Sequence, residues 1–156
     1  MKKTRIKAKD LSKVLDEKYS IDFSKKDKVE IWEDKEKCLK LYVVNDLISF
    51  YYYEDKLVPT LKLLQEDGNL LKRMVIDMGA VKFVVSGADI MRPGIVSFSD
   101  DINEGDFVVV VDENNQKPLA VGVSKKSSEV LNVIDKGKVV KNIHYVGDDL
   151  WKLGCS

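Results

Sequence analysis

Apolar side chains recur at roughly helical spacing over residues 4–19. Ile6, Leu11, Val14 and Leu15 fall on one face of such a helix, and lysines occupy much of the remaining surface. The pattern therefore predicts an amphipathic helix at the start of the chain.

The next part of the chain has a period of two instead. Apolar residues alternate in three runs, which contain Val29 and Ile31, then Leu39, Leu41 and Val43, then Ile48, Phe50 and Tyr52. β-branched and aromatic residues at alternate positions are typical of strands. Because the short polar stretches EDKEK and ND separate the runs, we expect a small antiparallel meander.

A short helix is expected directly after the meander. The stretch PTLKLLQE, residues 59–66, begins with a proline, which is well tolerated in the first turn of a helix. Gly68 follows where a helix commonly ends. The adjoining stretch EDGNLLKR, residues 66–73, is the most linker-like part of the chain. We therefore expect two domains, residues 1–70 and residues 71–156.

The second domain opens with a strand and an ambiguous segment. MVIDMG, residues 74–79, reads as a short strand that ends in a turn. In AVKFVVSG, residues 80–87, the valines and the phenylalanine favour a strand by propensity. Asp77 could nevertheless cap a helix here, and Gly87 could end it. The local pattern leaves both interpretations open.

Strands dominate the rest of the second domain. Residues 102–126 predict two buried strands joined by a polar turn. Residues 127–137, SSEVLNVIDKG, predict a short helix that is capped by Ser127 or Ser128. The tail, residues 138–153, predicts two strands around a GDD turn.

The charge balance gives no sign of a strongly basic protein. The 156 residues hold 26 Lys and Arg against 26 Asp and Glu, so the formal net charge is zero. Attraction to nucleic acid would therefore depend on local patches. The first thirteen residues form one such patch, with six basic side chains and a single acidic one, Asp10. The plainer interpretation of this patch is a solvated helix face or a frayed terminus.

Metal and disulfide chemistry find little support in the sequence. Cys38 and Cys155 follow no zinc-binding spacing, and His144 is the only histidine. We therefore expect no metal, no other cofactor and no disulfide, which suits a reducing cytoplasm. No run is long enough to span a membrane, and the basic start lacks the apolar core of a signal peptide. A cytoplasmic protein with no membrane partner is expected.

The stretch MVIDMGAVKFVVSGADIMRPGIV, residues 74–96, holds a strand, an acidic residue, a Gly-Ala pair, a further glycine and a Pro-Gly pair. In this order the elements resemble the opening of a PUA domain, the RNA-binding module shared by pseudouridine synthases and archaeosine transglycosylases. The resemblance implies that the segment after Gly79-Ala80 is a helix. It also implies that residues 71–156 form a mixed, mostly antiparallel, β-barrel-like domain with short helices.

Four stretches together are similar to one subfamily, the malignant T-cell-amplified-sequence family of translation-associated PUA proteins. They are PTLKLLQ at 59–65, GAVKFVVSGADIM at 79–91, VGVSKKSSE at 121–129 and KNIHYVGDDLW at 141–151. This resemblance covers most of the chain from Leu57 on. It implies an α+β fold in which an N-terminal α/β domain with a small antiparallel sheet precedes the PUA domain.

In PUA domains, RNA lies in a groove between the first helix and the strand that follows. Carried over by position, the resemblance implies an RNA-binding surface of Gly79, Lys82, Ser86, Gly87, Ala88, Met91, Arg92, Pro93 and Gly94. Glycines without a Cβ would let RNA approach the backbone closely. Arg92, expected to be exposed, is a candidate for a phosphate contact or for stacking on a base.

Several candidates also have a structural interpretation. Gly87 could be a left-handed helix cap, and Met91 could lie in the core. Lys125 and Lys126 follow a strand and are further candidates for RNA phosphate contacts, but they could equally be a solvated charge pair.

The aromatic residues outside this surface favour packing. The YYY run invites a stacking-platform interpretation, but strand alternation places Tyr51 and Tyr52 on opposite sides, so at least one should be packed. His144 and Trp151 are expected to fix the last strands. The aspartate pair at 148–149 would point apart in a strand, which is a poor arrangement for paired catalytic carboxylates.

The resemblance implies a non-enzymatic RNA-binding protein of the translation machinery. It would bind tRNA, the small ribosomal subunit or both, in initiation or recycling, and a second translation factor is a further candidate partner. The alternative is an accessory PUA protein that directs tRNA or rRNA to a separate modification enzyme. An enzyme in its own right is disfavoured, because the sequence has no separate catalytic domain, metal-ligand set or nucleotide-binding loop.

Overall fold

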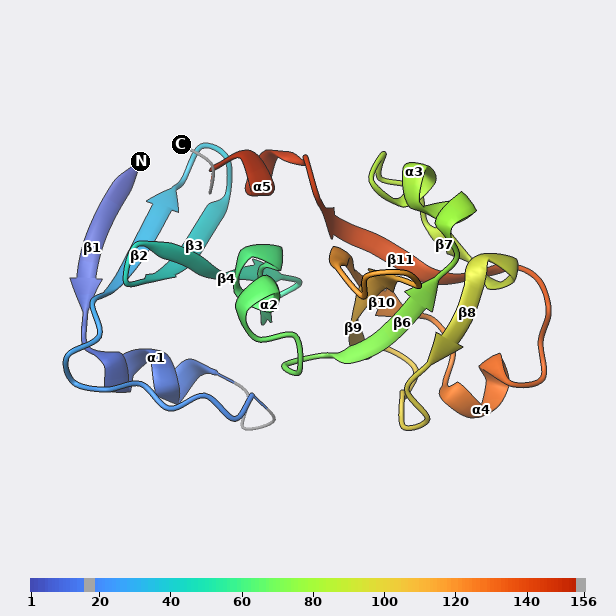
Figure 1. The fold of residues 1–156 in the computed structure, drawn as a ribbon. Helices are drawn as coiled ribbons and strands as arrows, with labels where there is room; N and C mark the ends of the chain where they lie inside the picture. The colour runs from blue at the N-terminus through green and yellow to red at the C-terminus, as the bar shows by residue number, and fades with distance from the viewer. Residues whose placement is uncertain (16–18, 154–156) are drawn as a thin grey trace. The chain divides into compact units, whose positions relative to one another are not determined.

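The computed structural model describes residues 1–15 and 19–153 and divides the chain into two compact units, Met1–Leu63 and Leu64–Ser156. Each unit is built around a sheet of its own (Figure 1). The expected α+β architecture is therefore confirmed.

A five-stranded antiparallel sheet forms the first unit. Its strands lie in chain order and are β1 (Lys2–Ile6), β2 (Val29–Asp34), β3 (Leu39–Val44), β4 (Leu47–Tyr53) and β5 (Lys56–Pro59). The turns Asn45-Asp46 and Glu54-Asp55 have positive φ at both residues, as tight two-residue hairpins require. The predicted meander is confirmed, and the structure adds β1 and β5 at the two edges of the sheet.

The start of the chain differs from the sequence prediction. A strand, β1, and a shorter helix, α1 (Ala8–Val14), replace the single helix expected over residues 4–19, and residues 16–18 lie outside the described residues. The strand pairs with β2 along its whole length, with Ile6 opposite Val29. This ladder satisfies backbone groups that the first turn of a helix would leave unpaired. The prediction of helix over the strand residues was wrong.

The core of the first unit lies between α1 and one face of the sheet. Ala8 and Leu11 of the helix are buried, and they share a cluster with four buried side chains of the sheet: Val29, Tyr42, Phe50 and Leu57. Ile6 packs against the same cluster. The apolar residues of the amphipathic pattern thus do reach one core, although a strand and a helix contribute them separately.

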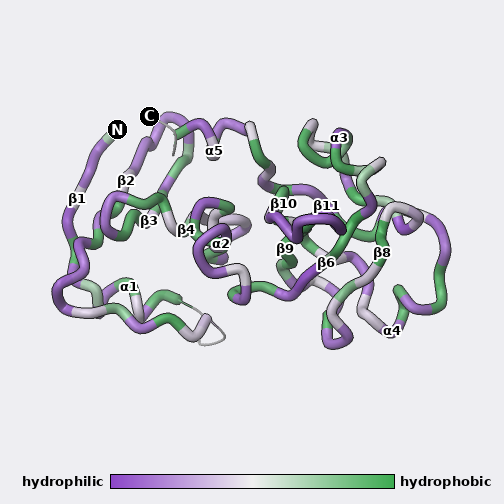
Figure 2. Tube along the Cα trace, viewed as in Figure 1, coloured by the Kyte–Doolittle hydropathy of each residue, from purple (hydrophilic) through white to green (hydrophobic). Residues whose placement is uncertain are grey.

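A six-stranded mixed sheet forms the second unit. The strands are β6 (Lys72–Ile76), β7 (Ile90–Met91), β8 (Ile95–Phe98), β9 (Phe107–Asp112), β10 (Pro118–Ser124) and β11 (Lys138–Tyr145). Their spatial order is β7-β11-β10-β9-β6-β8, with β6 parallel to β9 and the other neighbours antiparallel. Every residue of β9 is buried, and its hydrophobic run lies inside the sheet (Figure 2). A strand covered on both faces needs such a continuous apolar run.

A short helix, α2 (Leu61–Glu66), precedes β6, and further short helices connect the strands of the second unit. They are η1 (Met78–Ala80), α3 (Val81–Val84), η2 (Arg92–Gly94) and α4 (Ser128–Leu131). The Asp77 carboxylate accepts a hydrogen bond from Ala80 N at 2.9 Å, and Ser127 Oγ accepts one from Val130 N at 3.3 Å. Both are N-caps. The helices expected after Pro59, after Gly79-Ala80 and after Ser127 are therefore confirmed.

The tail differs from the prediction after β11. The GDD stretch begins a helix, α5 (Asp149–Leu153), where a second strand was expected. Asp148 Oδ1 accepts a hydrogen bond from Trp151 N at 2.8 Å, which caps this helix. The aspartate that resembled part of a β-turn is thus the helix cap, and the prediction of a strand was wrong.

Two further expectations concern membranes and cysteines. Within the described ranges, no helix is long and apolar enough to cross a membrane. Cys38 carries an exposed free thiol, whereas Cys155 lies outside the described residues.

The boundary between the domains stays a prediction, and limited proteolysis can test it. The two compact units meet within α2, a few residues before the predicted boundary between 70 and 71. Glu66 at the end of α2 is exposed, and so are Asp67 and Asn69 after it. Because exposed connecting backbone is cut first, we expect a glutamate-specific protease to cleave after Glu66 before it cleaves elsewhere. Earlier cleavage inside residues 76–150, where Glu104, Glu113 and Glu129 are also exposed, would contradict this boundary.

Candidate functional site

A groove beside α3 and β7 is the candidate site of the second unit. It has a volume of about 700 Å³ and is lined by Gly79, Ala80, Phe83, Val84, Gly87, Ala88, Asp89, Ile90, Met91, Gly94 and Lys138. We refer to it as the α3 groove. Its lining comes from the end of η1, from α3, from the loop after it, from β7, from the end of η2 and from the start of β11.

Large apolar side chains form both the floor and the rim of the α3 groove. Val84 and Ile90 are each 2% exposed and belong to the core of the unit. Phe83 is 58% exposed and Met91 is 46% exposed, although both line the cavity. Exposed apolar side chains beside a cavity are typical of a binding surface.

Hydrogen bonds hold α3 against β11 despite its short length. Asn142 Nδ2 donates to the carbonyl oxygens of Val84 at 3.0 Å and Ala88 at 3.1 Å, and Asn142 N donates to Asp89 Oδ1 at 2.9 Å. The amide of Ala88 also donates to the carbonyl of Phe83, which closes the helix end. The backbone that carries Phe83 is therefore fixed from both sides.

The glycine at the end of α3 is required by packing as well as by conformation. Gly87 has φ of +94°, and a Cβ there would lie 3.0 Å from the Tyr145 ring. A left-handed φ alone favours glycine, so the helix-cap interpretation of Gly87 is supported. Because the Tyr145 ring fills the space next to Gly87, this glycine serves the fold whether or not RNA approaches it.

The charges of the α3 groove are balanced. Lys138 Nζ lies 3.7 Å from Asp89 Oδ2, and these two residues supply the charged groups of the lining. Lys82 stands just outside, with its Nζ 5.1 Å from the centroid of the Phe83 ring. A groove with an apolar lining and one ion pair suits the flat faces of nucleotide bases better than a run of phosphates.

Comparison with known proteins identifies both units. Residues 72–146 match the model of the PUA domain, and residues 3–67 match that of a domain of unknown function, DUF1947. Translation machinery-associated protein 20 of Schizosaccharomyces pombe is 37% identical over 119 residues, which cover 73% of this chain and 66% of that protein. Malignant T-cell-amplified sequence 1 of Rattus norvegicus is 38% identical over 132 residues, which cover 83% of this chain and 73% of that protein. The chain belongs to the malignant T-cell-amplified-sequence family.

A solved structure has a similar fold over nearly the whole chain. A hypothetical protein from Pyrococcus horikoshii superposes with a TM-score of 0.83 at 33% identity, over 98% of this chain and 99% of that one. Some curated relatives are longer than the matched part, which spans as little as 60% of one of them. The resemblance to the malignant T-cell-amplified-sequence family and to PUA domains is confirmed.

The structure brings only part of the predicted surface together in the groove of the PUA domain. The predicted residues that line it are Gly79, Gly87, Ala88, Met91 and Gly94. Met91 is exposed, so it does not lie in the core. The predicted residues outside the lining are Lys82, Ser86, Arg92, Pro93, Lys125 and Lys126. All of these except Arg92 are exposed.

Arg92 is not the exposed contact that the sequence suggested. Its side chain is half-buried, with Nε donating to the carbonyl of Leu131 at 2.9 Å and a terminal nitrogen donating to the carbonyl of Ile95 at 3.2 Å. The guanidinium carbon also lies 5.6 Å from the centroid of the Phe98 ring. Arg92 thus joins η2 to α4 and β8 of the PUA domain, which leaves fewer of its N–H groups for RNA.

Sequence reasoning missed Phe83 and Lys138. Ala80, Val81, Val84 and Val85 all pack against the core of the PUA domain, and this spacing places Phe83 off the buried face of the helix. That signal becomes readable once the segment is assigned as a helix. Lys138 had no local signal, because it reaches the groove through its pairing with Met91 between β11 and β7.

The remaining aromatic and polar candidates are structural. Tyr51 is 7% exposed and Tyr52 is 36% exposed, so packing of at least one is confirmed. His144 is 1% exposed, and its Nδ1 lies 2.8 Å from Asp148 Oδ2. Over residues 1–15 and 19–153, no cluster of three His, Cys, Asp or Glu side chains could hold a metal ion.

Proposed function

We propose that this protein binds RNA through the α3 groove of its PUA domain and acts in translation without catalysing a reaction. The two named relatives include a translation machinery-associated protein, which supports the translation-related role. The PUA match over residues 72–146 supports RNA as the ligand. The function is proposed for the cytoplasm, where translation takes place.

The observation that carries this proposal is the exposed ring of Phe83 on the rim of an apolar groove. A base of an unpaired nucleotide can stack on the free face of this ring, as single-stranded RNA does on aromatic side chains in many modules. Lys82, 5.1 Å from the ring, places a positive charge where the phosphate of such a nucleotide can lie. The lining therefore binds bases, and the cation outside it binds the RNA backbone.

The RNA that this arrangement fits is an unpaired end or loop. The bases of a duplex are stacked on one another and do not offer their faces to a protein ring, whereas unpaired nucleotides do. We propose that the ligand is the single-stranded part of a tRNA, held on the small ribosomal subunit during initiation or recycling. A second translation factor is proposed as a partner in that assembly.

Substitution of Phe83 by alanine tests the groove. Loss of the stacked ring is expected to weaken tRNA binding by about 1–3 kcal/mol, without lowering the melting temperature, because Phe83 is largely exposed. Fluorescence anisotropy with a labelled tRNA measures the affinity. Val133→Ala is the matched control, since Val133 is 81% exposed and does not line the groove. Unchanged tRNA affinity in the folded Phe83→Ala protein would show that RNA does not bind here.

The translation role has its own test. Tagged protein is sedimented with small ribosomal subunits, with and without the Phe83→Ala substitution. We expect the parent to co-sediment with the subunit and the variant to do so less when tRNA is present. Recovery of the parent only with free tRNA and a modification enzyme would contradict the translation role while leaving RNA binding intact.

A further inference from the structure

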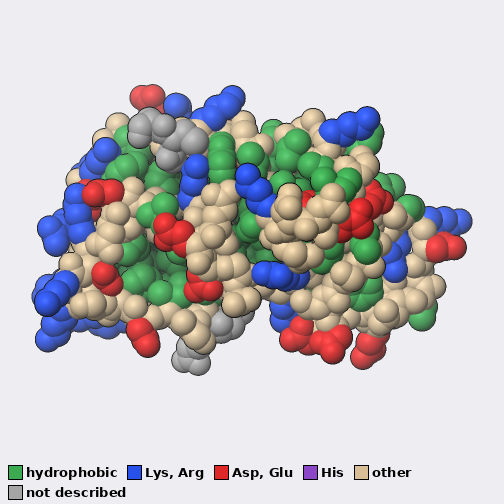
Figure 3. Space-filling view, in the orientation of Figure 1, with side chains coloured by type: hydrophobic (Ala, Val, Ile, Leu, Met, Phe, Trp, Pro, Cys, Tyr) green, Lys and Arg blue, Asp and Glu red, His purple; other side chains and the backbone are tan. Residues whose placement is uncertain are grey.

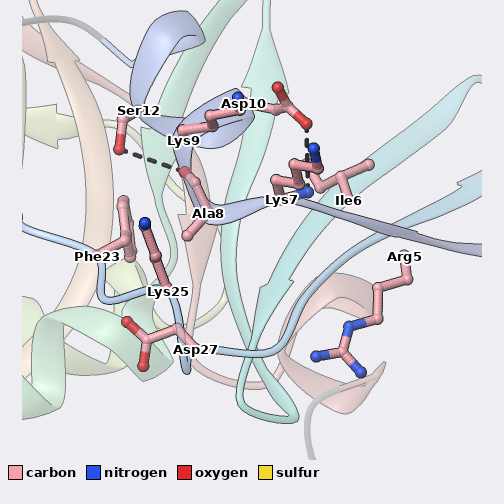
Figure 4. A pocket seen from close by; sticks show the side chains of 10 residues that line it. All are labelled: Arg5, Ile6, Lys7, Ala8, Lys9, Asp10, Ser12, Phe23, Lys25 and Asp27. Atoms are coloured by element: carbon pink, nitrogen blue, oxygen red, sulfur yellow. Dashed lines mark hydrogen bonds between the residues drawn. The ribbon is translucent and has the colours of Figure 1, made fainter.

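A second cleft lies in the first unit, far along the chain from the α3 groove. It has a volume of about 960 Å³. Three segments line it: the end of β1 with Arg5 and Ile6, the linker and first part of α1 from Lys7 to Ser12, and the loop before β2 with Phe23, Lys25 and Asp27. Figure 4 shows Lys25 and Phe23 reaching from this loop toward α1. We refer to this cavity as the basic cleft.

Cations outnumber carboxylates in the basic cleft. Four positively charged side chains line it, together with two carboxylates. The cations are Arg5, Lys7, Lys9 and Lys25. All four are exposed, and none makes an ion pair with another described residue. Lys and Arg side chains also predominate on the edge of this unit that carries β1 and α1 (Figure 3).

The two carboxylates of the cleft are engaged in holding its walls. Asp10 Oδ2 accepts a hydrogen bond from Lys7 N at 3.2 Å (Figure 4). Asp27 accepts from Asn45 Nδ2 at 3.0 Å and from Ser24 N at 2.8 Å, and these bonds lower the pKa of Asp27. Both carboxylates are thus tied to the local backbone or to a neighbouring amide. The four cations make no ion pair with another described residue that would have to break when they bind an anion.

The basic cleft has a local excess of positive charge, although the formal net charge of the chain is zero. The α3 groove is charge-balanced by one ion pair, whereas the basic cleft has four cations against two carboxylates. Attraction to a polyanion depends on such local patches rather than on the total. The two cavities therefore differ in what they can bind: one suits bases and the other suits phosphates.

We propose that the basic cleft binds the phosphodiester backbone of RNA, and that it gives the domain of unknown function an RNA-binding role. Its cations come from a strand, a helix and a loop around an open volume, which suits a chain of phosphates rather than one small anion. Phe23 adds a half-buried aromatic side chain to the same lining, next to the cations. Phosphate contacts combined with an aromatic surface are typical of proteins that bind single-stranded RNA.

A charge-neutralising triple variant tests the proposal in the full chain. Arg5→Gln, Lys9→Gln and Lys25→Gln remove three cations of the cleft and leave Lys7, whose backbone amide binds Asp10. Each phosphate contact contributes about −0.7 to the log–log slope of RNA affinity against salt for single strands. The slope measured with a short single-stranded RNA of mixed sequence is therefore expected to become shallower by about 2.

The matched control removes the same charge from positions outside the cleft, in the turn between β2 and β3 and at the start of β5. Lys35→Gln, Lys37→Gln and Lys56→Gln neutralise three exposed lysines that do not line the cleft, and this variant is expected to keep the parent slope. Equal slopes for the cleft variant and the parent would overturn the proposal. Displacement of the RNA by polyglutamate at the same charge concentration would overturn RNA as the ligand and indicate an acidic protein surface.

The outcomes for the two sites are separable. Phe83→Ala is expected to lower affinity and leave the salt slope nearly unchanged, whereas the cleft variant is expected to change the slope. If the parent binds RNA and only the Phe83 variant binds it more weakly, the α3 groove is an RNA site and the basic cleft is not. If only the cleft variant binds RNA more weakly, the basic cleft is an RNA site and the α3 groove is not. If the parent binds no RNA, both assignments are wrong.

Discussion

Alanine in place of Gly122 is expected to destabilise the PUA domain by about 3 kcal/mol, the upper end of the usual cost of overpacking a core. Gly122 lies in β10, at the register shift where β10 pairs with β11. A Cβ there would overlap the buried side chain of Val140 and lie 2.9 Å from the backbone oxygen of Lys141. Both neighbours belong to the adjacent strand, so neither can move aside without disturbing the pairing. Thermal unfolding should show a melting temperature lower by more than about 10 °C.

The control for this variant separates overlap from loss of glycine as such. Gly137 has φ of +97°, and a Cβ there would have no atom within 4 Å. Gly137→Ala is therefore expected to cost only the strain of a left-handed conformation, about 1 kcal/mol. A loss of stability at Gly122 no larger than the loss at Gly137 would show that the strands are less tightly packed at the register shift than the structure indicates.

The local sequence was sufficient to predict the meander but not α3. Alternation alone was sufficient for the strands from Val29 to Tyr53, because each pairs with a neighbour in sequence through short turns. In α3, the valines favour a strand, and the segment is a helix because Val81, Val84 and Val85 pack on the core. Asp77 caps η1, which leads directly into α3. Tertiary packing overrides propensity there. Only the family resemblance predicted that helix.

The two wrong predictions of secondary structure concern contacts that the local sequence does not show. β1 is a strand because β2, more than twenty residues further along the chain, offers it a partner, and nothing within residues 2–6 indicates that partner. α5 is a helix because Asp148 caps it, although the same GDD letters are typical of a turn between strands. The deciding contact is pairing with a distant strand for β1 and a hydrogen bond from one side chain for α5.

The position of the cavity agrees with the groove that the family resemblance implies, and its lining agrees in part. The resemblance implied a groove between the first helix and the strand that follows, and a cavity is found between α3 and β7. Five of the predicted residues line it: Gly79, Gly87, Ala88, Met91 and Gly94. The predicted surface also held four cations that do not line the cavity, Lys82, Arg92, Lys125 and Lys126. The one lysine of the lining, Lys138, is paired with Asp89. Arg92 could not be assigned without the structure, because the carbonyl of Leu131 that it binds belongs to α4, far along the chain.

Removal of the Asp148 carboxylate is the second change with a large expected effect. Asp148 Oδ2 is hydrogen-bonded to His144 Nδ1 at 2.8 Å and accepts a hydrogen bond from Tyr145 N at 2.9 Å. Asp148 Oδ1 accepts a hydrogen bond from Trp151 N at 2.8 Å. His144 is 1% exposed, so water cannot replace the lost acceptor without opening the core. Loss of a helix cap and of acceptors for buried donors costs about 1–3 kcal/mol each. Asp148→Ala is therefore expected to destabilise the PUA domain by about 3 kcal/mol.

Hydrogen exchange locates that effect, since the amides of Tyr145 and Trp151 should exchange much faster in Asp148→Ala than in the parent. Asp148→Asn is the matched control, because its remaining oxygen can still cap Trp151. Equal protection of both amides in parent and alanine variant would contradict the assigned role.

Acid should remove the same stabilisation from the parent. Burial on its own would raise the pKa of Asp148, but the hydrogen bonds from His144, Trp151 N and Tyr145 N outweigh it and hold this pKa below its ordinary value. A carboxylate with a lowered pKa in the folded state contributes stability at neutral pH and down to the unfolded pKa, about 3.9. That contribution is lost as the pH falls through the lower, folded pKa. Denaturant unfolding across this acid range should therefore show a steeper loss of stability in the parent than in Asp148→Ala, and parallel pH profiles for the two proteins would mean that Asp148 does not carry the acid sensitivity.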